Sequence, residues 1–424
     1  MAPRAPFACP LAEELADDVL ERFLRYVRVD TQGAYRVAER PSTTKQLDLS
    51  RLLLEELRAI GLEDAELNDG CSVVATLRGT VDAPVVGLIA HVDTTPDVLG
   101  AGVRPLVHEA WDGEPLVLPG DARQVLDPRE LPELADRVGH DLVTSDGTTL
   151  LGADDKAGIA EIVTAVAHLA RHPELPRAPI RIAFTVDEEV GRGVEEFDLE
   201  AFGAEVAYTL DGSGLGELEL ETFSAVSVRV TIRGHSVHPG SAKGKLVNAV
   251  KLAADLVASL PKGRLSPETT EDRQGFVHPH RISGGTETTV VDFIVRDHDG
   301  GLLEQHVQLV RDLAREVAAR EPRAHVELEV EETYRNMRPY IEEDPRVVVA
   351  ALEAIRRAGV EPRLAITRGG TDGARLSERG LPTPNLFTGG HEYHSVREWA
   401  SVQDMAAAAA TIVELAGVWA KPLG

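Results

Sequence analysis

The sequence predicts an α/β protein with a central, mostly parallel sheet and a smaller α+β domain inserted into it. Short apolar runs alternate with helical patterns, which is typical of βαβ units around a parallel sheet. This alternation changes character between residues 222 and 335, and the 424 residues exceed what one hydrophobic core usually organises. We therefore expect a discontinuous larger domain of residues 1–221 and 336–424, interrupted by an inserted domain of residues 222–335.

The larger domain begins with amphipathic helical stretches at 11–27 and 49–60. Brief, mostly apolar runs then predict buried strands at 85–90, 180–186 and 206–210, with a helix at about 156–170 between the first two. After the insertion, the pattern predicts a helix at 347–358, strands at 364–367 and 385–387, and an Ala-rich helix at 402–420. Because open α/β sheets bind ligands beyond the carboxyl ends of their strands, functional residues are expected just after these runs.

The inserted domain has a different pattern. We expect strands at 224–232, 287–296 and 325–330 and helices at 246–260 and 302–319. The segment 261–285 is rich in Pro, Thr and charged residues, so it is predicted to be an exposed loop.

Composition limits the environment and the partners of the protein. The chain has 44 Lys and Arg against 70 Asp and Glu, a net charge of -26 that repels nucleic acid and anionic membranes. Cys9 and Cys71 are the only cysteines, too few for a disulfide framework or a Cys-based zinc site. The N-terminus lacks the apolar core of a signal peptide, and no apolar run reaches the roughly 18 residues of a membrane span. We expect a cytoplasmic protein with no nucleic-acid or membrane partner.

A predicted strand end and a turn before a predicted helix each carry a pair of potential ligands. His91 follows the 85–90 strand, and Asp93 lies two residues further on. A neutral His can bind zinc while a nearby carboxylate fixes the orientation of its ring. Alternatively, His91 is a histidine that is only hydrogen-bonded at the end of the strand. Asp154 and Asp155 lie in the turn before the 156–170 helix. One of them can cap that helix, but two exceed what capping needs.

Carboxylates and histidines follow three further runs. Asp187, Glu188 and Glu189 lie directly after the 180–186 run. They form either a solvated acidic loop or a site in which one glutamate binds metal and the other accepts a proton. Asp211 closes the 206–210 run, where it can also serve the following Gly-rich turn. His391 and His394 follow the 385–387 strand, and one of them is expected to be spare.

All five segments belong to the α/β part and offer His, Asp or Glu at the same predicted sheet edge. A set of two His and three carboxylates without Cys suits two zinc ions about 3.5–4 Å apart that share a carboxylate and a hydroxide. The sequence therefore predicts a dinuclear centre that activates water.

Seven blocks of the sequence resemble a known family. They are AHVDTTPD (90–97), LLGADDKAGIAEI (150–162), AFTVDEEVGRG (183–193), the DG turn at Asp211, VHPGSAKGKLVNA (237–249), RGGTDGARLS (368–377) and NLFTGGHEYH (385–394). They are similar to the co-catalytic zinc peptidases, a group that includes aminoacylases and glutamate carboxypeptidases, and within it to the tripeptide aminopeptidases of the peptidase T family. The resemblance implies a zinc-peptidase catalytic domain with an inserted lid domain.

The resemblance also implies roles for individual residues. Asp154 would bridge two Zn²⁺ ions, for which Co²⁺ or Mn²⁺ are possible substitutes; His91 and Asp211 would complete one site, and Glu189 and His394 the other. Glu188 would be the general base, and Asp93 would orient His91. His391 would not be a ligand.

The inserted domain is expected to contribute substrate contacts. By resemblance, His238 would stabilise the oxyanion, although it is otherwise an ordinary turn His beside Pro239. Arg296 and Arg368 are candidates to clamp a peptide carboxylate or to form structural ion pairs. Asn336 would bond the peptide backbone or act as a hinge residue. Ser236 and Ser395 depart from the family pattern, but neither is a ligand.

These features predict an aminopeptidase that releases the N-terminal residue from tripeptides, with a short peptide as substrate and a homodimer through the lid as an open possibility. The same metal site would also suit a dipeptidase, a carboxypeptidase or an N-acyl amino acid hydrolase. A protein that binds peptides without cleaving them is the alternative from another class.

Overall fold

The computed structural model describes residues 3–422, which divide into two compact units. Unit 1 comprises residues 3–220, 339–365 and 371–422, and unit 2 comprises residues 221–338 and 366–370. In the described residues, no helix combines the length and apolar character needed to cross a bilayer. The assignment of the two units as a catalytic domain and a lid stays a prediction.

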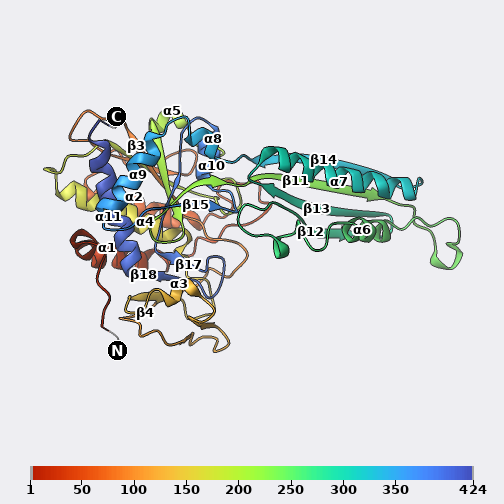
Figure 1. Ribbon diagram of the computed structural model, residues 1–424, viewed down its shortest axis with the longest axis horizontal. Coiled ribbons are helices and arrows are strands. Elements are labelled where there is room, and N and C mark those ends of the chain that lie inside the picture. Colours follow the sequence, from red (N-terminus) through yellow and green to blue (C-terminus); the bar gives the residue numbers. More distant parts are fainter. Residues whose placement is uncertain (1–2, 423–424) are drawn as a thin grey trace. The chain divides into compact units, whose positions relative to one another are not determined.

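Unit 1 is organised around an eight-stranded mixed sheet with strand order β1-β2-β8-β3-β9-β16-β10-β15 (Figure 1). Strands β8, β3, β9 and β16 pair parallel to one another, whereas β1 with β2, β2 with β8 and β10 with β16 are antiparallel. The strands are β1 (Glu66–Leu67), β2 (Val73–Leu77), β3 (Val86–His91), β8 (Ile180–Thr185), β9 (Val206–Gly212), β10 (Glu217–Thr222), β15 (Arg363–Thr367) and β16 (Asn385–Phe387). The α/β class and the buried strands expected from the apolar runs are confirmed.

Most helices of unit 1 pack on this sheet or on one another. Pro10 opens the N-terminal helix α1, whose N-cap Cys9 accepts the Ala12 N–H, and the Ala-rich α11 begins after Ser401, which caps the Asp404 N–H. Gly158 lets α4 lie close to β9, since a Cβ there would come within 2.1 Å of the Leu210 carbonyl oxygen. The helices are α1 (Pro10–Tyr26), α2 (Gln46–Ile60), α3 (Pro132–Ala135), α4 (Ala153–Arg171), α5 (Leu199–Phe202), α8 (Arg338–Ile341), α9 (Arg346–Arg357), α10 (Asp372–Glu378) and α11 (Val402–Trp419).

A second, four-stranded sheet of unit 1 was not expected from the sequence. Its order is β17-β18-β7-β4, and its apolar core includes Trp111, Leu142 and Trp399. Its strands are β4 (Leu106–His108), β7 (Leu142–Thr144), β17 (Gly390–His391) and β18 (Trp399–Ser401), and a separate small ribbon joins β5 (Leu116–Val117) to β6 (Val125–Leu126). The sheet positions the segment between β17 and β18, which contains His394.

Unit 2 is a four-stranded antiparallel sheet, β12-β13-β11-β14, with α6 and α7 packed against it (Figure 1). Its elements are β11 (Ser224–Arg233), η1 (Pro239–Ser241), α6 (Ala249–Ala258), η2 (Pro267–Thr269), β12 (Phe276–Gly284), β13 (Thr288–Asp297), α7 (Gly300–Arg320) and β14 (His325–Tyr334). The prediction of a loop throughout 261–285 is wrong, because β12 lies within it and buries Phe276 and Val277. Pro279 concealed the strand, but β12 is an edge strand with a register shift after Pro279, where a missing N–H is tolerated.

Candidate metal centre

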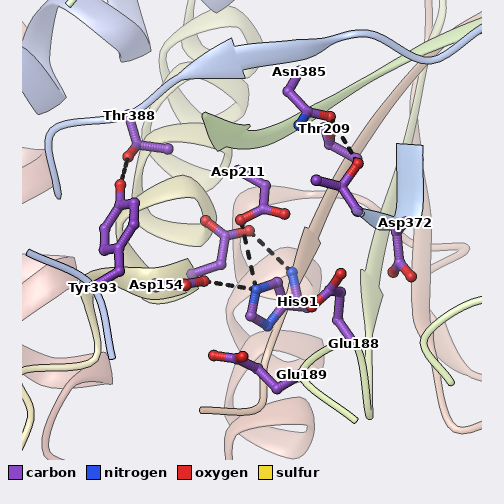
Figure 2. Close-up of polar contacts among 12 residues, drawn as sticks. His91, Asp154, Glu188, Glu189, Thr209, Asp211, Asp372, Asn385, Thr388 and Tyr393 are labelled. Carbon is purple, nitrogen blue, oxygen red and sulfur yellow. Dashed lines mark hydrogen bonds and ion pairs between the residues drawn. The ribbon is translucent and has the colours of Figure 1, made fainter. Parts of the chain in front are cut away.

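Two groups of potential metal ligands meet at one aspartate of unit 1. His91, Asp154 and Asp211 form the first group, and Asp154, Glu189 and His394 form the second; within each group the ligand atoms lie within 4.8 Å of one another. Figure 2 shows His91, Asp154 and Asp211 with their polar atoms together, and Glu188 and Glu189 beside them. Residues from five distant segments of the chain therefore converge at a single site.

Asp154 joins the two groups through its two carboxylate oxygens. Oδ1 lies 2.9 Å from Nε2 of His91, and Oδ2 lies 3.2 Å from Nε2 of His394. The first turn of α4 makes this possible, because Asp154 (φ -84°, ψ 104°) and Asp155 are not helical, so Asp154 is not used as an ordinary helix cap. Nε2 of His91 also lies 3.7 Å from Asp211, and Nε2 of His394 lies 3.0 Å from Glu189.

The three consecutive carboxylates after β8 have separate environments. Asp187 is fully buried and accepts the Ser42 N–H and the Gln46 amide, so it anchors the segment. Asp93 accepts the backbone N–H groups of Glu188 at 3.0 Å and of Glu189 at 3.1 Å. Its Oδ1 also lies 3.4 Å from Nδ1 of His91. Asp93 thus contacts both the His91 ring and the backbone that carries the two glutamates.

Burial and mutual charge shift the pKa values of these groups strongly. Burial raises the pKa of Glu188 well above its usual range and that of Glu189 to about 8, and it also raises the pKa of Asp211. Hydrogen bonds to Asp154 and Glu189 raise the pKa of His394 to about 11. Burial lowers the pKa of His91, but its bonds to Asp154, Asp211 and Asp93 outweigh this effect and leave that pKa well raised. So many carboxylates in a buried space can all be ionised only if positive charge lies beside them.

Two details of the site fit a bound cation. Glu189 Oε1 is buried and has no hydrogen-bond partner among the described residues, although buried carboxylate oxygens are almost always paired. His394 adopts a left-handed backbone conformation, φ 56°, which costs a non-glycine residue about 1–2 kcal/mol and is found preferentially at functional sites. A cation at this position would bind the unpaired Glu189 oxygen and the His394 ring nitrogen.

His391 and His394 have different surroundings. His391 is buried, its ring stacks on Trp399 with centroids 4.1 Å apart, and its Nε2 lies 3.8 Å from Asp404. The structure does not bring His391 into either ligand group, whereas His394 belongs to the second.

Glu398 supports the site and was missed in the sequence, where no motif marks it. Its Oε2 accepts the N–H groups of Leu151 at 2.8 Å and Gly152 at 2.7 Å, and its Oε1 accepts the N–H of Asp154 at 3.1 Å. Glu398 is 1% exposed, and burial raises its pKa to about 7 despite these bonds. This one carboxylate therefore holds the turn that presents Asp154.

Asp372 was also missed, although it lies within the RGGTDGARLS block. It is buried, accepts the Thr185 hydroxyl at 2.9 Å, and has its pKa raised to about 6 by burial. Gly193 makes room for it, because a Cβ at that glycine would lie 2.1 Å from Asp372 Oδ1. Figure 2 shows Asp372 on the Glu188 side of the centre.

The four residues expected to contact substrate all belong to unit 2. Asn336 donates its amide to Glu221 and to the His298 carbonyl, and its Oδ1 accepts the Arg338 N–H. Arg368 donates to the Asp272 and Gln274 carbonyls and to Thr270. The amide of Asn336 and the guanidinium of Arg368 thus already bond within unit 2.

Arg296 and His238 make fewer side-chain hydrogen bonds within unit 2 than Asn336 and Arg368. Arg296 donates from Nη1 to the Arg368 carbonyl at 3.1 Å, while its buried Nε has no partner among the described residues. His238 is exposed, and its Nδ1 accepts the Gly240 N–H at 3.1 Å.

Comparisons with known proteins identify the family of the chain. The profile of "Peptidase family M20/M25/M40" matches residues 140–417. Peptidase T of Geobacillus kaustophilus is 45% identical over 403 residues, 95% of this chain and 98% of that protein. Peptidase T of Listeria monocytogenes is also 45% identical, over 404 residues that cover 95% and 98% of the two chains.

Solved structures show the same fold. The crystal structure of aminopeptidase PepT from Bacillus cereus superposes with a TM-score of 0.74 at 25% identity, covering 96% of this chain and 99% of that one. A dinuclear metal binding peptidase from the M20 family, the YXEP protein of Bacillus subtilis, has a TM-score of 0.64 at 17% identity and covers 96% and 98% of the two chains. The chain is a peptide hydrolase that belongs to peptidase family M20/M25/M40 and, within it, to the peptidase T family.

Proposed function

We propose that the protein is a two-metal aminopeptidase that releases the N-terminal residue of tripeptides. The observation that carries the metal centre is the position of Asp154, whose two oxygens face the histidines of two different ligand groups at 2.9 and 3.2 Å. A carboxylate with one oxygen facing each group could hold two ions about 3.5–4 Å apart. Its tripeptide substrate is proposed from the similarity to peptidase T.

Zinc is the metal we propose, with His91 and Asp211 on one ion, Glu189 and His394 on the other, and Asp154 on both. Nitrogen and carboxylate ligands without Cys also suit Co²⁺ and Mn²⁺, so these remain substitutes. When bound, the ions lower the pKa of a water molecule and polarise the scissile carbonyl. The unpaired Glu189 Oε1 supports the assignment.

Glu188 is proposed as the general base. Its carboxylate accepts a proton from the attacking water and passes it to the leaving amine, so the peptide is cleaved without net proton uptake by the residue. Asp93 positions Glu188 by holding its backbone N–H at 3.0 Å, and it orients the His91 ring. Burial raises the pKa of Glu188, and cations bound beside it would favour its ionised form, which is the form that accepts a proton.

Unit 2 is proposed as the lid. His238 is proposed to donate to the oxyanion and Arg296 to bind the peptide carboxylate, although Nη1 of Arg296 already donates to the Arg368 carbonyl. Asn336 and Arg368 remain candidate substrate residues, but their recorded bonds favour a structural role first. Pairing of two chains through the lid and a cytoplasmic location are proposed from the sequence alone.

A peptide panel tests the function. We expect Leu-Gly-Gly to be cleaved to Leu and Gly-Gly by the zinc-loaded protein, with N-acetyl-Leu-Gly-Gly and the dipeptide Leu-Gly turned over far more slowly. Release of the C-terminal Gly would indicate a carboxypeptidase, preference for the blocked peptide an acyl amino acid hydrolase, and preference for Leu-Gly a dipeptidase. Binding of the tripeptide without any cleavage would indicate the non-catalytic alternative.

The role of Glu188 is tested in the same assay. Glu188→Gln should lower kcat by about 10²–10⁴-fold while leaving two metals per chain, because only the proton acceptor is removed. Glu196→Gln is the matched control, since it makes the same change at an exposed residue of the same segment. Equal activity of Glu188→Gln and Glu196→Gln would exclude Glu188 as the base.

A further inference from the structure

Unit 1 contains a third cluster of potential ligands, away from the proposed dinuclear centre. His168 lies in the last turn of α4, His172 is the residue at which that helix ends, and Glu14 comes from α1. Their ligand atoms lie within 4.8 Å of one another. Neither the proposed reaction nor the family resemblance gives these residues a role.

His168 is the fixed member of the cluster. Its side chain is only 6% exposed, yet its Nδ1 has no hydrogen-bond partner among the described residues. That nitrogen points toward Glu14, with Oε1 of Glu14 at 3.5 Å, beyond a good hydrogen bond. A buried, unpaired ring nitrogen facing a carboxylate is unusual, because buried polar atoms are almost always paired.

The other two members can move to complete a site. The side chains of His172 and Glu14 are 40% and 61% exposed, so their rotamers are free to adjust. Tetrahedral zinc with ligands at about 2.1 Å holds its ligand atoms about 3.4 Å apart, so the ligand atoms, which lie within 4.8 Å of one another, need to approach by at most about 1.4 Å. Residues four apart on a helix lie on the same face, and the His168 and His172 rings lie side by side with centroids 4.4 Å apart, so the half-buried His172 ring must turn for the in-plane lone pairs of the two rings to meet at one ion.

The electrostatic surroundings favour a cation. The end of α4 presents the negative end of the helix dipole. Arg171 is close, but its charge is paired with Asp18 at 3.1 Å. Glu174 lies 2.9 Å from Nδ1 of His172, in the position of a carboxylate that orients a metal-binding ring. Burial lowers the pKa of His168, which keeps its lone pair available.

We propose that His168, His172 and Glu14 bind a single divalent transition-metal ion of the zinc class, with water as a fourth ligand, and that this ion ties α1 to the end of α4. Two imidazoles and one carboxylate suit Zn²⁺, Co²⁺, Ni²⁺ or Cu²⁺, whereas Mg²⁺ and Ca²⁺ prefer all-oxygen sites. The site is structural rather than catalytic. It does not depend on the proposed function.

The test counts metal ions in the full-length protein. After chelation and reloading with Co²⁺ or Zn²⁺, wild type should hold one more ion per chain than His172→Ala, whatever number the dinuclear centre holds. Glu14→Gln should weaken that extra ion by more than the roughly 10–100-fold that losing an outer hydrogen-bond partner of a ligand costs. Glu13→Gln, which makes the same change at the exposed neighbour on α1, should match wild type.

Two further measurements make the result decisive. A crystal grown with zinc should show an anomalous peak among His168, His172 and Glu14, and kcat of His172→Ala should equal that of wild type. An equal number of ions in wild type and His172→Ala would overturn the proposal, as would an extra ion that zinc crystals place elsewhere.

Discussion

Glu398 offers the sharpest test of how the centre is built, through the substitution Glu398→Gln. The carboxylate has two accepting oxygens for three backbone N–H groups, two on Oε2 and one on Oε1. A glutamine keeps one oxygen. If that oxygen stays with Leu151 and Gly152, the new NH₂ group faces the Asp154 N–H, donor against donor.

The structure sets the size of the effect. A buried donor left without an acceptor costs about 1–3 kcal/mol. In the metal-free variant, we expect the Asp154 backbone to move so that its N–H finds another acceptor. Metal binding requires Asp154 to return to its original position, so the free-energy cost lowers the affinity for metal. At about 1.4 kcal/mol per factor of ten, affinity should fall roughly 5- to 150-fold.

The assay is competition for zinc against a chromogenic chelator, with thermal unfolding of the metal-free protein measured alongside. Asp141→Asn is the control, because Asp141 is equally buried and also accepts a backbone N–H, that of Ala110 at 2.8 Å. We expect both variants to lose thermal stability but only Glu398→Gln to lose metal affinity. The reasoning is refuted if zinc binds Glu398→Gln and Asp141→Asn equally well.

Three other predictions follow from the same geometry. Asp211→Asn and Glu189→Gln should each reduce the proposed centre from two ions to one, and Asp154→Asn should remove both ions. Metal analysis after dialysis measures the number of ions per chain. Two ions retained in all three variants would contradict the prediction. The chelated protein should lose stability as pH rises, because groups whose pKa is raised in the native state bind protons more tightly there than in the unfolded chain. The pH window is about 4.5 to about 8 for Glu189 and about 6.5 to about 11 for His394. Melting temperatures of the chelated protein should therefore fall from pH 5 to pH 9, and added zinc should make this fall smaller. Arg368→Ala should lower the free energy of unfolding by about 2–4 kcal/mol, since the guanidinium bonds the 270–274 segment and lies 5.0 Å from the Phe223 ring centre. Urea unfolding measures this loss. Unchanged stability with a raised KM would instead indicate that Arg368 binds the peptide carboxylate.

The sequence predicted best those features that local pattern determines. The apolar runs at 85–90, 180–186 and 206–210 correspond to β3, β8 and β9, because buried parallel strands need uninterrupted apolar residues. The 156–170 helix is longer in the structure, Ala153–Arg171, since its irregular first turn carries no helical periodicity.

The features it missed depend on residues far apart in the chain. Strands β17 and β18 are two and three residues long, too short for any period to be seen, and β18 is paired to β7 more than 250 positions earlier. Glu398 has no distinguishing neighbours, and its importance arises only from the turn at 151–154 that folds onto it. His394 and Asp154 were identifiable as ligand types, but their separation of 3.2 Å belongs to the fold.

The position of β16 has a consequence for how the enzyme is made. This strand is formed by Asn385–Phe387, yet it lies between β9 and β10, which are synthesised about 170 residues earlier. In a growing chain the position between β9 and β10 therefore has no strand until translation is nearly finished. All four strands of the unit 2 sheet, β11–β14, lie within residues 221–338 and are made earlier. We expect strands β11–β14 to pair on the ribosome before residues 366–370 complete unit 2 and before β16 completes the main sheet. Because His394 is made after β16, a partly made chain would lack this proposed metal ligand.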